Sequence, residues 1–466
     1  VNSFYGIRYA QPPTEQLRWR PPQPIEKALD HSEPSILNAT TRGPSCVQGQ
    51  AFWQNPSMLP FKPDGAEDCL LLDVVQPAGI EQTANLPVIV QIHGGCYIHL
   101  DSQSFTGYAL MKHSQNSIIY ISIQYRLGAY GFLYSDELGQ EGSANLGLQD
   151  QRYALQWIKR HISAFGGDPG KVTIMGGSAG GASVTNQMIL YGGAEAPLFR
   201  AAIAEYPWWP PYLAKKQLLK QYKKLLTAAN CTDMSCLRSL DEDSLALAAQ
   251  TTFITGYGDY GYGNCYYGPY VDGLVVQDYP SKEFEKGNYV KVPVILDRER
   301  FEGYTFTNTS MTTIEEETED LKIQFPGADE GFVEEVLSLY PREDFNSTFF
   351  QRQTWFGDIY IDCPTYYVAS SMSSAGLPVW KMLFETGSQK HGATVPYLFD
   401  VNYGCKSPEP PFNVQFFDLI PVHQSLPLRQ RRLRLHNERL DSVFCCHSES
   451  KFAVLEWVGQ TILACV

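Results

Sequence analysis

The residue that most clearly offers chemistry is Ser178, which stands in the pentapeptide Gly-Gly-Ser-Ala-Gly at residues 176–180. Residues 172–175 form an apolar run of strand length, and residues 182–190 contain helix formers without proline, so the serine lies where a strand becomes a helix. Such a tight turn lifts a serine hydroxyl clear of the backbone, and the flanking glycines leave room for the neighbouring elements. The pattern therefore predicts a nucleophilic serine. Because it also arises by chance in long chains, other residues must support the prediction.

A second candidate is the turn His-Gly-Gly-Cys-Tyr at residues 93–97, which directly follows the apolar run of residues 86–92. Consecutive glycines after a strand allow backbone N–H groups to point outward together, as the donors of an oxyanion hole must. Taken alone, the same residues are more typical of an ordinary glycine-rich turn.

Two further polar residues each follow a predicted strand. Glu302 comes after the apolar run of residues 292–296, and His391 comes after the run of residues 378–384. Taken singly, such a glutamate is almost always a solvated surface charge, and one of nine histidines is equally unremarkable. Their order along the chain, serine, acid and histidine, is the order that α/β-hydrolases use. The three residues are therefore candidates for one site.

The elements that must position these residues alternate between strands and helices. Apolar runs predict strands at residues 86–92, 117–123 and 172–175, while residues 154–162 carry apolar side chains at helical spacing. This alternation indicates an α/β fold with a mostly parallel central sheet flanked by helices. Catalytic groups then belong at the carboxyl ends of the strands, where the serine and the glycine-rich turn both lie.

Three aromatic segments lie between these motifs. Residues 206–212, Tyr-Pro-Trp-Trp-Pro-Pro-Tyr, are expected to form a rigid loop and a pocket wall, and the Tyr/Gly-rich residues 257–270 to form either mobile pocket lining or plain surface. The aromatic residues between Cys46 and Cys69 either anchor a surface loop or contact substrate, with equal weight.

Composition limits the class of partner. The 466 residues are 44% hydrophobic, so they can bury a large core, and their net charge of −14 opposes a polyanion such as nucleic acid. No apolar run approaches the ~20 residues that a membrane span needs. We expect a small-molecule substrate, no nucleic-acid partner, no transmembrane segment, and no metal or organic cofactor, while the oligomeric state is left open.

Sequons and cysteines favour the secretory route. Four Asn-x-Ser/Thr sites offer N-glycosylation acceptors at Asn38, Asn230, Asn308 and Asn346. The eleven cysteines show no metal-ligand spacing with histidine, so disulfides are expected, and the odd number leaves at least one thiol free. The chain begins at Val1 without a charged and then apolar leader, so any signal peptide is expected to be absent from this sequence.

Together the motifs resemble the type-B carboxylesterase and lipase family, the cholinesterase-like branch of the α/β-hydrolases, and within it fungal secreted esterases. The resemblance runs from about residue 4 to residue 399 and implies the α/β-hydrolase fold. Seven motifs carry it in order: Gly-Ile-x-Tyr-Ala (6–10), Glu-Asp-Cys-Leu (67–70), His-Gly-Gly (93–95), Tyr-Arg-Leu-Gly (125–128), Phe-Gly-Gly-Asp-Pro (165–169), Gly-Ser-Ala-Gly-Gly (177–181) and Val-Asp-Gly (271–273).

The resemblance implies a role for each candidate. Ser178 would be the nucleophile, His391 the general base and then the general acid, and Glu302 the carboxylate that orients the histidine. The implied oxyanion donors are the backbone N–H groups of Gly95, Cys96 and Ala179.

The resemblance also implies three structural pairs. Two of them are disulfides, Cys46 with Cys69 and Cys231 with Cys236, and the third is an ion pair between Arg126 and Asp168 near the sheet.

Two residues near the site depart from the family's pattern. Gly177 stands where many members carry a glutamate before the serine, which argues against a choline-like cationic substrate. Cys96 stands where the family usually has glycine, so its N–H can serve only if the local backbone suits a residue with a Cβ.

The resemblance ends near residue 401. We expect residues 1–400 to form an α/β-hydrolase domain and residues 401–466 an atypical C-terminal tail, and we hypothesise that an altered splice site or reading frame produced this tail. The basic run at residues 429–435 is interpreted as a solvated helix face in preference to a partner-binding patch.

The leading functional prediction is a serine hydrolase that cleaves carboxylic esters of uncharged, moderately sized groups through an acyl-enzyme. A triacylglycerol lipase of the same family is the first alternative, and the short span from Cys46 to Cys69 disfavours it because it leaves little material for a lid. The second alternative is a catalytically silent cholinesterase-like adhesion or binding module. Such modules typically lack a triad member, and this sequence lacks none.

Overall fold

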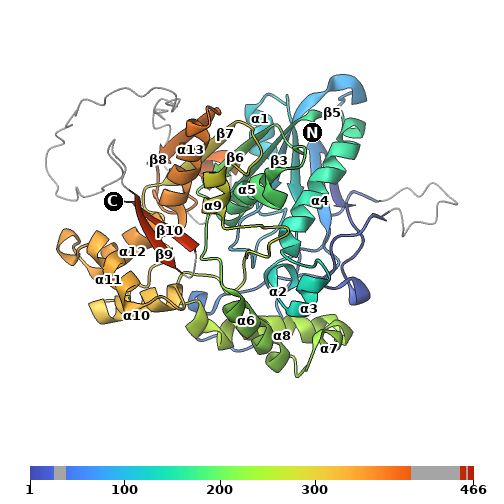
Figure 1. The fold of residues 1–466 in the computed structure, drawn as a ribbon. Helices are drawn as coiled ribbons and strands as arrows, with labels where there is room; N and C mark the ends of the chain where they lie inside the picture. Colours follow the sequence, from blue (N-terminus) through green and yellow to red (C-terminus); the bar gives the residue numbers. More distant parts are fainter. Residues whose placement is uncertain (26–37, 400–451, 458–459, 466) are drawn as a thin grey trace, which may run out of the picture.

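An eight-stranded sheet forms the centre of the computed structural model, which describes residues 1–25, 38–399, 452–457 and 460–465 (Figure 1). The strands lie in the order β1-β2-β4-β3-β5-β6-β7-β8. Their bounds are β1 Asn2–Arg8, β2 Leu71–Gln76, β3 Leu86–Ile92, β4 Ile119–Ile123, β5 Gly167–Gly177, β6 Ala201–Glu205, β7 Val294–Glu299 and β8 Val379–Phe384. The six strands from β4 to β8 in this order run parallel, while β2 pairs antiparallel with both β1 and β4.

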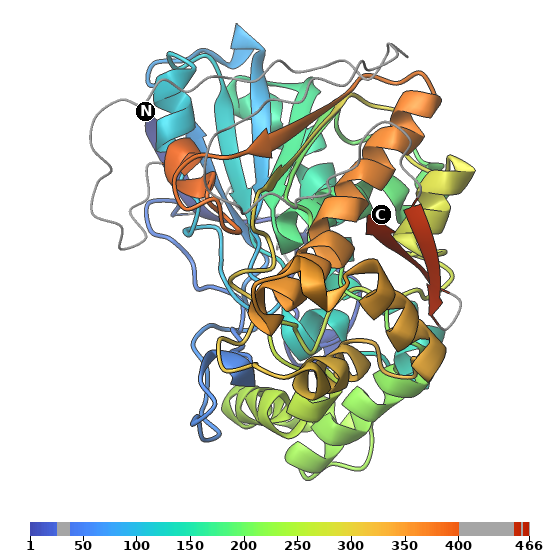
Figure 2. The ribbon, with the colours of Figure 1, turned by 90° about the vertical axis from the view of Figure 1, so that its left-hand side faces the viewer.

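The helices divide into those that cover the sheet and those that extend beyond it. Helices α4, α5 and α13 pack against the sheet, and central strands such as β4 are buried along their whole length. In both views α6 to α8 lie at the lower end of the molecule, and α10 to α12 lie above them, at the lower left in Figure 1 (Figures 1 and 2). The helices are α1 Tyr108–His113, α2 Gly128–Phe132, α3 Asp136–Gln140, α4 Leu146–His161, α5 Ala179–Ile189, α6 Lys215–Ala228, α7 Met234–Ser239, α8 Glu242–Thr255, α9 Pro280–Lys286, α10 Ile314–Gln324, α11 Glu330–Leu339, α12 Thr348–Gly357, α13 Cys363–Ser374 and α14 Val395–Phe399.

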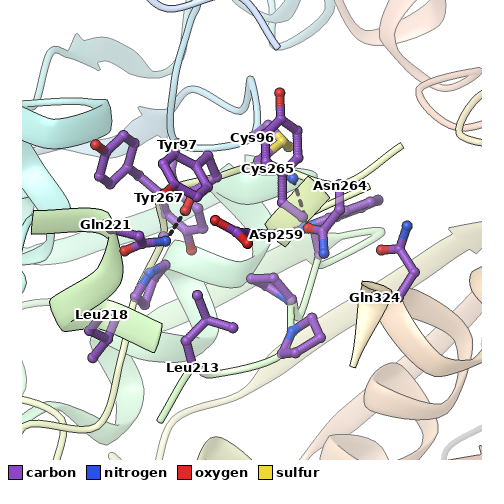
Figure 3. Close-up of a pocket in the computed structure, with 17 residues that line it drawn as sticks. Cys96, Tyr97, Leu213, Leu218, Gln221, Asp259, Asn264, Cys265, Tyr267 and Gln324 are labelled. Carbon is purple, nitrogen blue, oxygen red and sulfur yellow. Dashed lines mark hydrogen bonds between the residues drawn. A yellow bond between two sulfur atoms is a disulfide. The ribbon is translucent and has the colours of Figure 1, made fainter. Parts of the chain in front are cut away.

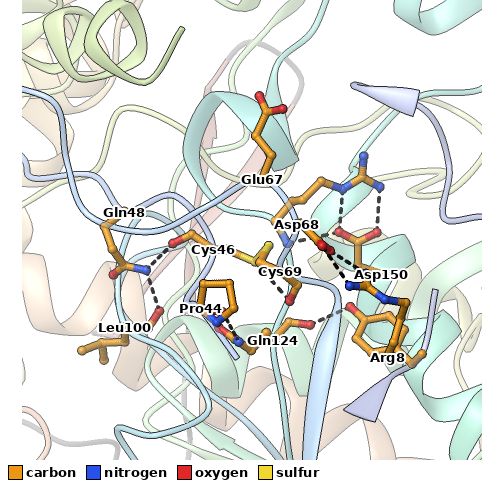
Figure 4. The surroundings of a disulfide bond; sticks show 12 residues. Arg8, Pro44, Cys46, Gln48, Glu67, Asp68, Cys69, Leu100, Gln124 and Asp150 are labelled. Carbon is orange, nitrogen blue, oxygen red and sulfur yellow. Dashed lines mark hydrogen bonds and ion pairs between the residues drawn. A yellow bond between two sulfur atoms is a disulfide. The ribbon is translucent and has the colours of Figure 1, made fainter. Parts of the chain in front are cut away.

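Disulfides hold the segments outside the sheet. The structure pairs Cys46 with Cys69, whose Cα atoms lie 4.9 Å apart, and Figure 4 shows this bridge beside the bidentate contact of Arg8 with Asp68. It also pairs Cys231, in the loop after α6, with Cys236 of α7. Both pairs are those that the family resemblance implied.

The implied ion pair between Arg126 and Asp168 is wrong. Arg126 instead contacts Asp150 of α4 at 2.7 Å, with side chains only 4% and 0% exposed, while Asp168 contacts Lys171 at 3.1 Å. The reason is the direction of the strands. Arg126 follows the carboxyl end of β4, whereas Asp168 lies at the beginning of the parallel strand β5, at the opposite edge of the sheet.

Near the C-terminus, β9 (Phe452–Trp457) and β10 (Gln460–Cys465) form a separate antiparallel pair. The remainder of the predicted tail, with the basic run at residues 429–435, lies outside the described residues. Within the described ranges, no helix has both the length and the apolar character needed to cross a bilayer.

Candidate active site

Ser178 occupies a strained turn between β5 and α5. Its φ of 59° and ψ of −126° are rare for a residue with a side chain, and the backbone is held in place from both sides. The Ser178 N–H donates to the Glu205 carbonyl at 3.1 Å, and the Ser178 carbonyl accepts from the N–H of Trp208 at 3.0 Å. The serine side chain remains half-buried at the carboxyl edge of the sheet, so solvent reaches it.

The glycine-rich turn of residues 93–97 packs directly against this serine. A Cβ added to Gly94 would lie 2.6 Å from the Gly177 carbonyl oxygen and 3.3 Å from Ser178 Cβ, so only glycine fits there. Gly176 is equally confined, since a Cβ there would lie 2.6 Å from the Ile92 carbonyl oxygen. The sheet therefore brings together the two glycine-containing motifs that the sequence separates by about eighty residues.

The backbone of this turn suits a set of outward-pointing donors. Gly95 and Cys96 have φ values of +89° and +60°, and the Gly95 carbonyl accepts from the N–H groups of Ile98 and His99 at 3.0 Å, which closes the turn. Neither the Gly95 N–H nor the Cys96 N–H forms a hydrogen bond within the described part of the chain. Ala179 is the first residue of α5, where backbone N–H groups have no partner inside the helix.

Glu302 and His391 are in direct contact. His391 Nδ1 lies 2.6 Å from Glu302 Oε2, and the side chains are 10% and 0% exposed. The segments that follow the paired strands β7 and β8 continue side by side, with the Phe301 N–H donating to the Gln389 carbonyl at 2.8 Å. This pairing explains why two residues 89 positions apart meet. The Glu299 N–H donates to Glu302 Oε1 at 2.6 Å and fixes the carboxylate.

No hydrogen bond joins Ser178 to His391. His391 Nε2 is buried and has no hydrogen-bond partner among the described residues. In enzymes without substrate, catalytic hydrogen bonds are often long and shorten only in the Michaelis complex. The structure thus joins acid and histidine directly and places the serine at the same edge of the sheet.

Burial sets the protonation of the acid–histidine pair. It raises the pKa of Glu302 to about 8 and lowers the pKa of His391 to about 4, while the charge of Glu299 raises the pKa of His391. Groups in such close contact titrate as a unit. The pair therefore shares one proton at intermediate pH, and it loses this proton, leaving a neutral imidazole beside a carboxylate, as the pH rises through about 8.

Three more carboxyl groups lie buried behind the pair and were missed in the sequence. Glu205, Asp297 and Glu299 are at most 3% exposed, and burial raises their pKa values well above the usual range. The charge of a neighbouring carboxylate adds to this rise, from Asp297 for Glu205, from Glu299 for Asp297 and from Glu302 for Glu299. Glu299 Oε1 accepts from the Thr394 N–H at 3.1 Å, so it also holds the segment that follows His391. The available signal was an acidic residue at the end of an apolar run, Glu205 after residues 201–204 and Asp297 after residues 292–296.

Aromatic rings enclose the histidine. The ring centroids of Tyr206, Trp208 and Phe306 lie 4.8, 6.2 and 4.9 Å from that of His391. The wall predicted at residues 206–212 thus borders the histidine itself. A Cβ at Gly177 would meet the Tyr206 ring, with Cζ at 2.5 Å, so tyrosine fills the space beside the nucleophile.

A small cavity of about 30 Å³ lies next to the glycine-rich turn (Figure 3). Its lining includes Cys96 of the turn, Trp208 and Gln221 of α6. Tyr266 and Tyr267 also line it and are buried, so the Tyr/Gly-rich run forms pocket lining and core, not plain surface.

The segment between Cys46 and Cys69 divides into two parts. Trp53 packs on Tyr262 and Phe306 at 5.2 and 6.2 Å between ring centroids, whereas Leu59 is 79% exposed and Phe61 is 38% exposed. The first part reaches the aromatic cluster beside the histidine, and the second part is surface.

The four sequons differ in exposure. Asn38, Asn230 and Asn346 are exposed, and Asn308 is half-buried.

The sequence matches a known family over most of its length, because residues 1–416 fit the pattern of the carboxylesterase family. The chain belongs to the carboxylesterase family. Among relatives, Lipase 2 of Geotrichum candidum is 33% identical over 385 residues, which cover 73% of this chain and 67% of the relative. Secreted lipase 1 of Botryotinia fuckeliana is 31% identical over 443 residues, which cover 87% and 74%.

Solved structures agree with this family. The crystal structure of Aspergillus niger EstA matches with a TM-score of 0.75 and 27% identity, covering 87% of this chain and 80% of EstA. A structure titled PNB esterase matches with a TM-score of 0.71 and 27% identity, covering 87% and 82%. The predicted family, the α/β-hydrolase fold and the class of carboxylic ester hydrolase are thereby confirmed.

Proposed function

We propose that this carboxylesterase-family protein cleaves carboxylic esters through an acyl-enzyme, with Ser178, Glu302 and His391 as its triad. The observation that carries the proposal is the buried 2.6 Å contact of Glu302 with His391, at the sheet edge where Ser178 occupies a strained turn. A serine hydroxyl is a poor nucleophile until a base takes its proton, and an imidazole held by a carboxylate is suited to that task.

The proposed reaction uses each group in turn. Ser178 Oγ attacks the ester carbonyl while His391 Nε2, buried and without another partner in the described chain, takes the hydroxyl proton. The N–H groups of Gly95, Cys96 and Ala179 stabilise the charge on the carbonyl oxygen. His391 then gives the proton to the departing alcohol, and a water molecule activated by the same imidazole releases the acid from the serine.

Within this chemistry we favour an esterase for uncharged, moderately sized groups over a lipase. Some relatives are named lipases and the solved structures esterases. The segment after Cys46, the place for a lid, is tied down, because Trp53 Nε1 donates to the Asn264 carbonyl at 2.7 Å and the Phe52 N–H donates to the Tyr260 hydroxyl at 2.9 Å. A lid that opens at a lipid surface would have to break these contacts.

A panel of p-nitrophenyl esters of increasing acyl length tests this choice. We expect the highest kcat/KM with short and medium acyl chains and no change in rate at the micellar limit. A preference for long chains, with a jump in rate above that limit, would reassign the protein to the lipases.

A fluorophosphonate probe tests the nucleophile. The wild type and a control variant, Ser338→Ala on the exposed face of α11, should label equally, and Ser178→Ala should not label. A thermal melt of each protein separates loss of chemistry from loss of fold. If a folded wild type failed to label, the catalytically silent binding module would become the better assignment.

We further propose that the protein passes through the secretory route as a glycoprotein, and that residues 1–400 form its catalytic domain. Four sequons, two disulfides at positions that the family resemblance implied, and relatives named as secreted lipases support this. Endoglycosidase digestion of the native protein should increase its gel mobility, and an unchanged mobility would contradict glycosylation at Asn38, Asn230, Asn308 and Asn346.

A further inference from the structure

A third disulfide, which the sequence did not suggest, joins the oxyanion turn to a distant segment. Cys96 is bonded to Cys265 across 169 residues, with Cα atoms 6.1 Å apart. Figure 3 shows this bridge at the rim of the cavity, near Tyr97 and Tyr267. The bridge therefore ends inside the proposed oxyanion hole.

The backbone at Cys96 has an unusual conformation. Cys96 and Tyr97 both have a φ of +60°, in the left-handed region that side-chain-bearing residues rarely adopt. The Cys96 N–H has no hydrogen-bond partner in the described chain. Hydrogen bonds hold the residues on either side, through the Gly95 carbonyl and through the Tyr97 carbonyl, which accepts from the Gly128 N–H at 2.7 Å. The Cys96 side chain adds a covalent attachment at the residue itself.

Hydrogen bonds hold the segment at the other end of the bridge, which carries Cys265. The Cys265 N–H donates to Asn264 Oδ1 at 2.7 Å, and Asn264 Nδ2 donates to the Tyr360 hydroxyl at 3.1 Å. The Tyr267 hydroxyl contacts Thr252 Oγ1 of α8 at 3.0 Å. Contacts to two separate helical regions thus brace the segment that carries Cys265.

We propose that the Cys96–Cys265 disulfide is a positioning element of the active site, which holds the Cys96 N–H in place as an oxyanion donor. This inference rests on the proposed esterase function. A glycine at position 96 would adopt the positive φ without strain, whereas the cysteine is restrained in this conformation by its disulfide. Its effect should appear in kcat, because oxyanion donors act mainly in the transition state.

Three variants test this role with a soluble p-nitrophenyl ester. Cys265→Ser removes the bridge and leaves a side chain at position 96, so kcat should fall about tenfold, equal to about 1.4 kcal/mol, with KM nearly unchanged. The double variant Cys96→Gly/Cys265→Ser also lacks the bridge but accepts a positive φ without strain, so it should recover most of the lost kcat. The control Cys231→Ser/Cys236→Ser removes a disulfide far from the turn and should retain kcat within about twofold.

Reduction provides an independent arm. Dithiothreitol transfers two electrons and two protons to the bridge, giving two thiols and the cyclic disulfide of the reagent. Cys96 and Cys265 are half-buried, as is Cys236, whereas Cys46 and Cys69 are almost fully buried. The reagent can therefore reach the Cys96–Cys265 and Cys231–Cys236 bridges, and the double variant controls for reduction of the second. Dithiothreitol should lower kcat about tenfold in the wild type and leave the double variant at its own unreduced rate.

The outcomes separate this inference from the proposed function. An inactive, folded wild type would refute the esterase. An active wild type with Cys265→Ser of equal kcat, or a Cys96→Gly/Cys265→Ser variant no better than Cys265→Ser, would refute the positioning role. Thermal melts of all variants identify any that lose activity by unfolding.

Discussion

The pH dependence of ester hydrolysis follows from the burial of the Glu302–His391 pair. The form that can accept the serine proton has a neutral imidazole beside an ionised carboxylate, and it exists only after the pair has lost its shared proton. Burial opposes the resulting net negative charge and raises the pKa of Glu302 to about 8. Activity should therefore be lost as the pH falls through about 8, above the ordinary histidine value of about 6.5.

The size of the change in kcat/KM between pH 7 and pH 8 distinguishes a pKa of about 8 from the ordinary histidine pKa of about 6.5. With a pKa of about 8, the active form makes up about 9% of the enzyme at pH 7 and about 50% at pH 8, so kcat/KM rises about fivefold. With an ordinary histidine pKa of about 6.5, the same interval raises kcat/KM only about 1.3-fold. A rise below twofold, with an acid limb at or below 6.5, would refute the reasoning.

The assay must report catalysis alone. Hydrolysis of a neutral p-nitrophenyl ester is followed at the isosbestic wavelength of the product, and the spontaneous rate is subtracted with Ser178→Ala. Glu302→Gln provides a second test, because it leaves His391 without its carboxylate. Its kcat should fall roughly 10³- to 10⁴-fold, and its residual activity should change little between pH 7 and pH 8, since burial lowers the pKa of the isolated imidazole.

Two further predictions concern stability. Gly177→Ala places a Cβ against the Tyr206 ring and should lower the free energy of unfolding by about 1–3 kcal/mol in a denaturant titration. The control Gly258→Ala, with open space around it, should leave this free energy nearly unchanged. Equal values for the two variants would contradict the close packing at Gly177. Arg126→Met leaves a buried carboxylate unpaired and should cost about 3–5 kcal/mol. In contrast, Asp168→Asn at the surface should change the thermal midpoint little, and a large change would contradict a surface role for Asp168.

Much of the fold could be predicted because it depends on local patterns. The runs at residues 86–92 and 378–384 were apolar, of strand length, and closed by glycine or polar residues, and they became β3 and β8. The position of Ser178 between a strand and a helix followed from the same kind of pattern, because tight turns need small residues close to them in sequence.

What required the tertiary structure depends on contacts between distant segments. The predicted partner of Arg126, Asp168, was wrong because sequence order does not give the edge of the sheet at which a residue lies. Glu299 and the Cys96–Cys265 bridge were missed since their roles arise from burial and from proximity across the fold. The sequence thus determined which residues can do the chemistry. Tertiary packing decided their protonation and what holds them, because desolvation and cross-chain contacts exist only once the sheet has assembled.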